Sequence, residues 1–200
     1  MMKKLMTTAL AIALASACTL SASALSHTVV KGDTMWKLAV KYEVGTSEIA
    51  AANPQIADPN LIYPGQVLTI PELDAAVTAY EAEVIRLVNA ERAKQGLKAL
   101  TANWELSRVA RYKSQDMVDN KYFSHTSPTY GSPFQMIKNF GISFRTAGEN
   151  IAYGQRTPQA VVNAWMNSSG HRDNILNSSY TQIGVGYVAS GNYWTQMFIG

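Results

Sequence analysis

The pattern of apolar and polar positions after residue 25 begins with a short strand and an amphipathic helix. His27–Val30 alternates as a half-buried β-strand does. From Asp33 or Thr34, the expected N-cap, apolar residues recur at helical spacing until Gly45, which we expect to end the helix. These apolar positions are Met35, Leu38, Ala39 and Tyr42.

A second helix and a second strand follow in the same segment. Thr46 is the expected N-cap of a short helix, with Glu48 in its first turn beside the positive helix end. Asn53-Pro54 ends this helix because the residue before a proline avoids the α conformation. Gln66–Ile70 is the second strand, so the predicted order is strand, helix, helix, strand.

The remaining pattern predicts more helices than strands. Long amphipathic helices are followed by shorter ones that open with capping residues and a proline. The expected helices are Ala75 to Gly96, Trp104 to Asp119, Ser132 to Gly141 and Thr157 to Trp165. A short strand at Gly148–Ala152 precedes a terminal hairpin of Gln182–Ala189 and Tyr193–Ile199. We therefore expect an antiparallel sheet with helices packed on its faces, an α+β fold.

The first 24 residues have the layout of a secretory signal peptide. Lys3 and Lys4 precede an apolar run, and Ala22-Ser23-Ala24 is a small-residue cleavage site. The run is shorter than the ~20 residues that a membrane span requires, so we expect export without a transmembrane anchor. The single cysteine, Cys18, lies in this segment, and we favour cleavage there over lipidation. In either case the mature chain has no disulfide.

The charge of the mature chain argues against nucleic acid as its main partner. Loss of Lys3 and Lys4 lowers the formal charge of +3 by two. Phosphate binding requires a concentrated basic face, which a nearly neutral chain lacks. The charge does not exclude a cell wall, whose uncharged sugars could be the target. The length of 200 residues leaves room for one ordinary domain and a small module.

Residues 26–71 resemble the lysin motif (LysM) family along its whole length. The resemblance lies in HTVVKGDTMWKLAVKY, TSEIAAANP and LIYPGQVLTIP, with residues 72–79 as a short linker. It implies a βααβ module that binds N-acetylglucosamine glycans of the peptidoglycan or chitin type in a shallow groove between two loops. The implied contacts are Gly32, Asp33, Thr34 and Met35 on one side, and Asn53, Pro54, Ile56, Ile62 and Tyr63 on the other. The alternative is that Ile62 and Tyr63 only pack a small core. A single copy suggests modest affinity.

Residues 80–200 resemble the CAP superfamily, which includes cysteine-rich secretory, antigen 5 and pathogenesis-related proteins. The resemblance lies in FSHTSP, GEN, SGHRDNIL and the hairpin GVGYVASGNYWTQMF, and it is nearest to the disulfide-free bacterial branch of secreted and spore proteins. It implies an α–β–α sandwich whose cleft is lined by two His and two Glu. His125 and His171 take the histidine positions and Glu149 the first glutamate position. Ser168 stands where the family has its second glutamate.

Two neutral imidazoles and a carboxylate suit Zn²⁺ or another divalent metal, so His125, His171 and Glu149 are candidate ligands. Such a metal would acidify a bound water, and Glu149 is the candidate catalytic residue. A lone carboxylate cannot divide acid and base roles as two can, so we favour a role without catalysis. In the alternative interpretation, these three residues only hold loops together by hydrogen bonds. His171 follows a Ser-Ser-Gly break, which we expect to present it to solvent or a cleft.

Three functions remain open at this point. The first is a monomeric secreted protein that binds the cell wall through LysM, while its CAP domain has an interaction role in the envelope or spore coat. The second is a wall-targeted, metal-dependent hydrolase. The third is a binder of a lipid or another small apolar ligand.

Overall fold

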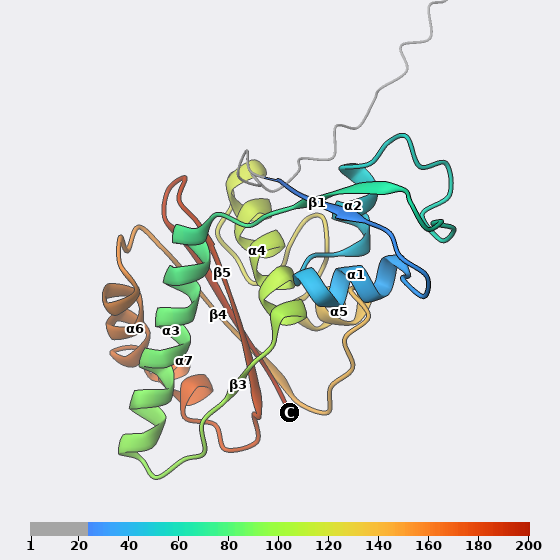
Figure 1. The fold of residues 1–200 in the computed structure, drawn as a ribbon. Coiled ribbons are helices and arrows are strands. Elements are labelled where there is room, and N and C mark those ends of the chain that lie inside the picture. The colour runs from blue at the N-terminus through green and yellow to red at the C-terminus, as the bar shows by residue number, and fades with distance from the viewer. Residues whose placement is uncertain (1–23) are drawn as a thin grey trace, which may run out of the picture.

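The first module is a two-stranded antiparallel sheet with two helices packed on it (Figure 1). The computed structural model describes residues 24–200, so the predicted signal peptide, apart from Ala24, lies outside the described residues. The elements are β1 (Ala24–Thr28), α1 (Met35–Tyr42), α2 (Thr46–Ala51) and β2 (Val67–Pro71). The predicted βααβ order is confirmed.

A small apolar core joins these four elements. Its buried residues are Val29, Met35, Leu38, Ala39, Val44, Ile49, Leu68 and Ile70. The side chain of Asn53 adds a polar tie, because its amide donates to the carbonyls of Ile49 and Thr69 and accepts from the Thr69 N–H. The module thus closes around one buried asparagine.

The boundary between α1 and α2 differs from the prediction. Thr34 caps α1, as expected, by accepting a hydrogen bond from the Lys37 N–H. However, α1 ends at Tyr42, and its C-cap Glu43 takes the left-handed conformation at φ 53°. Gly45 rather than Thr46 is the N-cap of α2. A Cβ atom at Gly45 would lie 2.0 Å from Glu48 Oε2 and 2.4 Å from Arg108 Cζ. A larger residue here would displace the ends of the Glu48 and Arg108 side chains, so Gly45 leaves room for their ion pair.

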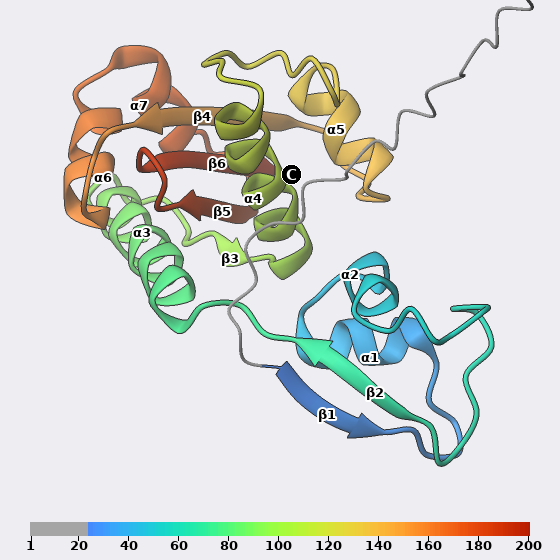
Figure 2. The same ribbon diagram turned by 90° about the horizontal axis from the view of Figure 1, so that it is seen from above.

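The second module is a sheet between two helical layers (Figures 1 and 2). Its helices are α3 (Ala75–Lys94), α4 (Trp104–Asp119), α5 (Pro133–Asn139), α6 (Pro158–Met166) and α7 (Ser169–Ile175). Its strands are β3 (Thr101–Ala102), β4 (Ala147–Tyr153), β5 (Gln182–Val188) and β6 (Tyr193–Ile199), in the order β3-β5-β6-β4. The α–β–α sandwich is confirmed. The sheet is not wholly antiparallel, because the two-residue strand β3, absent from the prediction, pairs parallel with β5.

Each face of the sheet has its own apolar core. Helices α3, α6 and α7 cover one face around Trp165, Trp194 and Phe198. Helices α4 and α5 cover the other around Leu106, Met136 and Met197. Helix α4 packs closely against strand β5, since a Cβ atom at Gly186 would lie 2.1 Å from the Arg111 backbone nitrogen.

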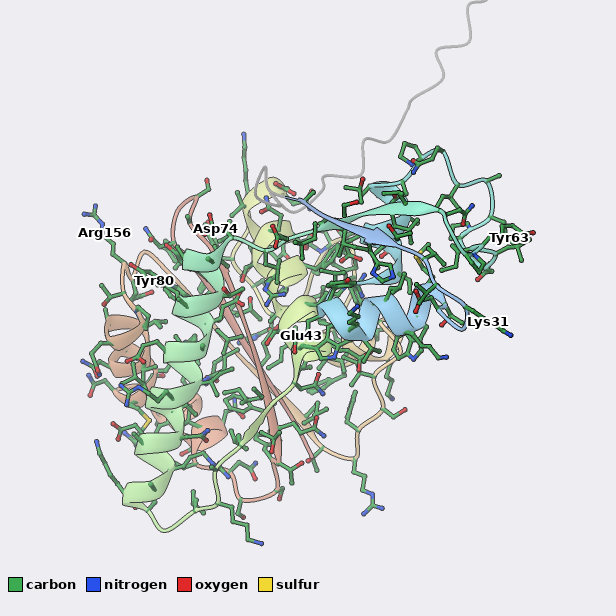
Figure 3. All side chains as sticks on the ribbon, in the orientation of Figure 1. Lys31, Glu43, Tyr63, Asp74, Tyr80 and Arg156 are labelled. Carbon is green, nitrogen blue, oxygen red and sulfur yellow. The ribbon has the colours of Figure 1, made fainter. Side chains whose placement is uncertain are left out.

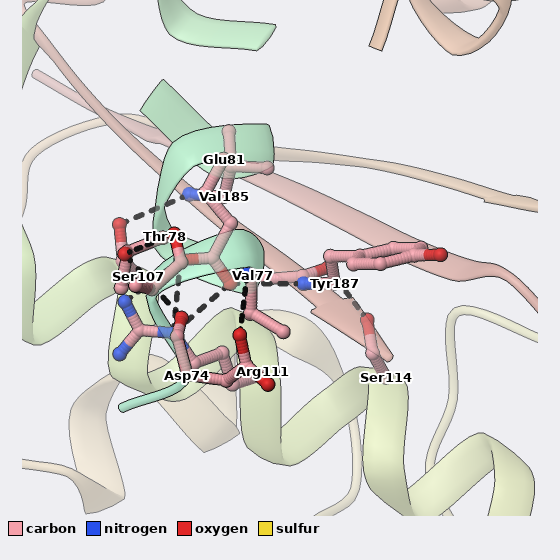
Figure 4. Close-up of polar contacts among 11 residues, drawn as sticks. Asp74, Val77, Thr78, Glu81, Ser107, Arg111, Ser114, Val185 and Tyr187 are labelled. Atoms are coloured by element: carbon pink, nitrogen blue, oxygen red, sulfur yellow. Dashed lines mark hydrogen bonds and ion pairs between the residues drawn. The ribbon is translucent and has the colours of Figure 1, made fainter. Parts of the chain in front are cut away.

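A buried ion pair ties α3, α4 and β5 together (Figure 4). The Arg111 guanidinium donates to both carboxylate oxygens of Glu81 at 2.8–3.0 Å. The Tyr187 N–H donates to the same carboxylate at 3.0 Å. Although Arg111 and this N–H lower it, burial raises the pKa of Glu81 overall. The pair fixes the helix that follows the first module.

The two modules meet through α2 and α4. Arg108 on α4 donates to the carboxylate of Glu48 on α2, and to the hydroxyl of Ser47 at 2.8 Å. Tyr112 donates its hydroxyl to Glu48 at 3.0 Å. Between the modules, only residues 72–74 separate β2 from α3. No helix among residues 24–200 is long and apolar enough to span a membrane.

Candidate functional site

His125 and Glu149 form a direct pair at the edge of the second module's sheet. Nδ1 of His125 lies 2.7 Å from Oε1 of Glu149. The His125 side chain is 54% exposed, whereas Glu149 is 2% exposed, so the carboxylate supports the imidazole from beneath. Burial raises the pKa of Glu149, although His125 and Lys113 act in the opposite direction. The second carboxylate oxygen, Oε2, is buried and has no hydrogen-bond partner in the described structure.

The loop that carries His125 is anchored by Lys113, a lysine of α4 that is 1% exposed. Its ammonium donates to the carbonyls of Ser124 and His125 at 2.7 and 3.0 Å, and to the Tyr122 hydroxyl at 3.0 Å. Burial lowers the pKa of Lys113. Sequence reasoning missed this role, but the signal was present, because Lys113 falls on the apolar stripe of the predicted helix 104–119.

Asp116, one turn further along α4, organises the same loop. Its carboxylate accepts hydrogen bonds from Tyr122, Ser127, Thr129 and Asn120. Burial works to raise the pKa of Asp116, but these hydrogen bonds lower it overall. Four donors on one buried carboxylate make the loop a fixed support for His125.

His171 lies inside a helix, which corrects the expected polar break. Residues 169–175 form α7, whose N-cap is Ser168. The break is therefore confined to the turn before Ser169. The helix is held by contacts distant in sequence: Arg92 on α3 donates to the carbonyls of Ile175 and Asn177, and Asn150 on β4 donates to the His171 carbonyl at 3.0 Å.

The imidazole of His171 lies within electrostatic range of His125. Burial, followed by the charge of His125, lowers the pKa of His171. Asn174, one turn on, donates its amide to the Glu149 carbonyl at 3.2 Å and to the Asn150 side chain at 2.9 Å. In the part of the chain that the structure describes, no hydrogen bond joins the His171 ring to His125 or Glu149. The structure brings His125 and Glu149 into contact, with His171 as an electrostatic neighbour.

Two of the three predicted zinc ligands, His125 and Glu149, contact each other. His125 Nδ1 is engaged by Glu149 Oε1, and the remaining oxygen of Glu149 is enclosed. Among residues 24–200, no group of three or more His, Cys, Asp or Glu side chains is placed so that it could hold one ion. The three residues do not fit a shared metal in this arrangement, and the metal site stays a prediction.

Ser168 supplies no replacement for the second family carboxylate. It is the N-cap of α7 by position, but its side chain accepts no capping hydrogen bond. Glu149 is thus the carboxylate of this site, which leaves one group where the resemblance implies two. The arrangement can orient an imidazole and hold a proton on a buried carboxyl, but two carboxyl groups are not available to divide acid and base roles.

The nine predicted glycan contacts of the first module divide by exposure. Met35 and Asn53 are buried, at 6% and 1%, and their side chains serve the core. Ile56 and Ile62 are half-buried against it, and the carboxylate of Asp33 accepts hydrogen bonds from His27 and the Val30 N–H. The Val30 N–H and then the His27 ring lower the pKa of Asp33. The exposed predicted contacts are Gly32, Thr34, Pro54 and Tyr63.

Tyr63 is the most prominent of these exposed residues. It is 55% exposed and lies at the end of the first module that is farthest from the second (Figure 3). The loop of Lys31 lies at this same end, which brings the two predicted groove walls together. An exposed tyrosine beside a polar loop is suited to a sugar, because the ring covers an apolar face while backbone groups and hydroxyls meet polar atoms.

Two family models match separate segments of the chain, one in each module. Residues 27–71 match the LysM domain, and residues 85–198 match the cysteine-rich secretory protein (CAP) family. The chain is 58% identical over 155 residues to an uncharacterized Bacillus subtilis protein, YkwD, which covers 78% of this chain and 60% of the relative. It is 44% identical over 45 residues to the spore coat assembly protein ExsA of Bacillus cereus, which covers 22% of this chain and 7% of the relative. The chain therefore spans less than two thirds of these relatives.

Solved structures show the same fold. An extracellular protein containing an SCP domain from Bacillus anthracis matches with a TM-score of 0.60 and 34% identity, covering 68% of this chain and 47% of that one. A cysteine-rich secretory protein from Staphylococcus aureus matches with a TM-score of 0.55 at 19% identity, covering 76% of this chain and 48% of that one, which supports the fold alone. The chain therefore belongs to the cysteine-rich secretory protein (CAP) family and carries a LysM domain before its CAP domain.

Proposed function

We propose that this protein is a secreted, monomeric cell-wall protein whose LysM domain binds N-acetylglucosamine glycans of the peptidoglycan or chitin type. The observation that carries the proposal is the LysM match over residues 27–71, together with the exposed loops that bear Thr34 and Tyr63. Two spore proteins and the secreted LysM effector ECP6 of Passalora fulva resemble this segment at 44–46% identity, which supports a role at an envelope.

The CAP domain has an interaction role in the envelope or spore coat under this proposal. His125 is its presented group, and Glu149 is the buried residue that orients it. Lys113 and Asp116 hold the loop rigid, which is what a recognition surface requires. With Ser168 in place of a second carboxylate, the site favours binding over acid–base chemistry.

Retention on purified peptidoglycan tests the LysM assignment. The full mature chain is expected to remain with the insoluble wall fraction, and Tyr63→Ala to reduce that retention. The matched control is Val67→Ala, an exposed residue of β2 outside the predicted groove. Equal loss in the two variants, or no retention of the wild type, contradicts the proposal.

A wall hydrolase is the second candidate, favoured by one observation. Glu149 is a buried carboxyl of raised pKa that lies 2.7 Å from an exposed imidazole, an arrangement suited to proton transfer. Incubation of purified wall with wild type and Glu149→Gln, with and without added Zn²⁺, separates the candidates. Release of soluble fragments by the wild type, but not by Glu149→Gln, supports hydrolysis. Metal analysis of the wild type against His125→Ala/His171→Ala tests the predicted metal independently of activity.

A further inference from the structure

Three aromatic side chains form a cluster at one end of the CAP sheet. Tyr153 at the end of β4 and Tyr193 at the start of β6 are directly opposite in the antiparallel pairing. Their rings are stacked, with centroids 5.7 Å apart. Phe123, in the loop after α4, meets Tyr153 edge to face at 4.7 Å. Because the rings come from three separate segments, the tertiary fold builds this cluster.

The cluster is exposed and borders a pocket. Phe123 is 44% exposed and Tyr153 56% exposed, although both are large apolar rings. Large contiguous exposed apolar patches mark binding surfaces, whereas single exposed apolar residues are ordinary. The pocket beside them has a volume of about 390 Å³, which is in the range of small-ligand sites.

The rest of the pocket wall is mixed and carries a positive charge. Lys121 and Ser190 supply its polar groups, beside Val118, Tyr122 and Gly191, and no acidic residue among residues 24–200 lines it. Lys121 follows α4 in the left-handed conformation at φ 53°, which is costly for a side-chain-bearing residue. Within residues 24–200 its ammonium makes no hydrogen bond or ion pair, so its charge is available to a ligand.

These features define the chemistry of the occupant. Flat aromatic faces pack against the apolar C–H face of a pyranose ring, hydroxyls of tyrosine and serine meet its polar edge, and an ammonium binds a carboxylate. A purely apolar ligand would make no use of the Lys121 charge, whereas a carboxylate can pair with it. We propose that this pocket is a second glycan site, which binds an acidic sugar of the wall polymer, with the pyranose on the aromatic cluster and the carboxylate at Lys121.

This site would supply what one LysM domain lacks. A lone module binds a polymer with modest affinity, and a second contact on the same chain raises the apparent affinity without strengthening either site. The pocket and the His125–Glu149 pair use the same loop and the same strand, since Phe123 precedes His125 in the loop after α4 and Tyr153 follows Glu149 on β4. The proposal relies on the proposed wall-binding function for the identity of the polymer alone.

Nuclear magnetic resonance on the isotope-labelled full mature chain tests the proposal. The probes are an N-acetylglucosamine–N-acetylmuramic acid tetrasaccharide, which carries carboxylates, and chitotetraose, which carries none. The tetrasaccharide is expected to shift amide signals in two groups, one in the LysM loops and one around Phe123, Tyr153 and Tyr193. Tyr153→Ala should remove the second group only. Lys121→Gln should weaken it about two- to fivefold for the tetrasaccharide and leave chitotetraose binding unchanged.

The matched control is Phe134→Ala, since Phe134 is also an exposed ring at 48% but lies outside the pocket. This variant should keep both groups of shifts. Shifts confined to the LysM loops in the wild type overturn the second site. A pocket response to lauric acid but not to the tetrasaccharide overturns the glycan assignment. Absent LysM shifts with pocket shifts present would contradict the proposed LysM function and leave this site supported.

Discussion

Arg108 of the CAP domain donates two hydrogen bonds to Glu48 of the LysM domain, from Nε to Oε1 at 2.6 Å and from Nη2 to Oε2 at 2.8 Å. The two side chains are only 20% and 15% exposed. The Arg108 guanidinium also lies over the rings of Tyr112 and Phe140, at 5.3 and 5.1 Å from their centroids. Two modules that the sequence divides by family are thus joined by one ion pair.

Replacement of Arg108 by Ala should loosen this junction. Hydrogen bonds to charged groups contribute roughly 1.5–3 kcal/mol when buried, so we expect the free energy of unfolding to fall by about 1–2 kcal/mol at this partly exposed pair. Small-angle X-ray scattering should show a larger radius of gyration. Arg86→Ala is the control, because its ion pair with Glu83 is exposed to solvent, so this variant should keep the stability and the radius of gyration of the wild type. An unchanged radius in Arg108→Ala would refute the junction.

The junction should also weaken in acid. Burial works to raise the pKa of Glu48, but Arg108, Ser47 and Tyr112 lower it overall from the usual 4.5. The pair therefore contributes stability above pH 4.5, and this contribution is lost as the pH falls through the lowered folded value. Urea unfolding should show Glu48→Gln less stable than wild type at pH 7, with the difference shrinking toward pH 3. A difference independent of pH contradicts this assignment.

Glu149 should have the opposite pH dependence. Burial raises its folded pKa above 4.5, so its favourable contribution is present below pH 4.5 and is lost as the pH rises toward and through the raised value. Relative to Glu149→Gln, the wild type should therefore lose stability between pH 4 and pH 7. The Gln oxygen can still accept from His125, which keeps the comparison close in shape. Parallel stability curves for the two proteins would show that Glu149 is not held in this environment.

Lys113→Met should release the loop that presents His125. The change leaves the carbonyls of Ser124 and His125 without their buried donor, and we expect a loss of about 3 kcal/mol in the free energy of unfolding. Amide hydrogen exchange should accelerate in residues 122–127. Lys138→Met is the control, since Lys138 is exposed on α5. Similar effects from both lysines would argue against the anchoring role.

Asn53→Ala and Tyr63→Ala should separate fold from binding in the LysM domain. Asn53 is buried and makes three backbone hydrogen bonds, so its loss should cost about 1–3 kcal/mol and lower the melting temperature. Tyr63 is exposed, so its loss should leave the melting temperature within about 1 °C while weakening retention on peptidoglycan. The reverse pattern would assign the sugar contact to Asn53.

Local chemistry made part of the fold predictable. Ser132 and Gln135 cap α5 reciprocally, as their spacing indicates, because the hydrogen bonds lie within four residues. Helix α7 was missed because Arg92 and Asn150 hold it from distant elements, while its own sequence is polar and contains Gly170. Strand β3 was missed for a related reason, since its two residues are a strand only through their pairing with β5.

The candidate site could also be predicted only in part: its residues, but not the contacts that hold them. Family resemblance identified His125 and Glu149, and the structure places them in contact. The resemblance could not show how the loop of His125 is held, because Lys113 and Asp116 act through backbone carbonyls and hydroxyls of that loop. The place of Lys113 on an apolar stripe indicates a buried lysine, but its partners are known only once the tertiary fold brings the loop back over the helix.

The short connection at residues 72–74 has a consequence for a repeating polymer. Together with the Arg108–Glu48 ion pair, it fixes the distance and direction between the LysM loops and the CAP domain. The connection is too short to extend and so increase that distance. If the LysM loops and the proposed CAP pocket bind one glycan strand, they would contact it at a set interval of sugar units. Lengthening the connection would then change which units they meet, even with every contacting side chain intact.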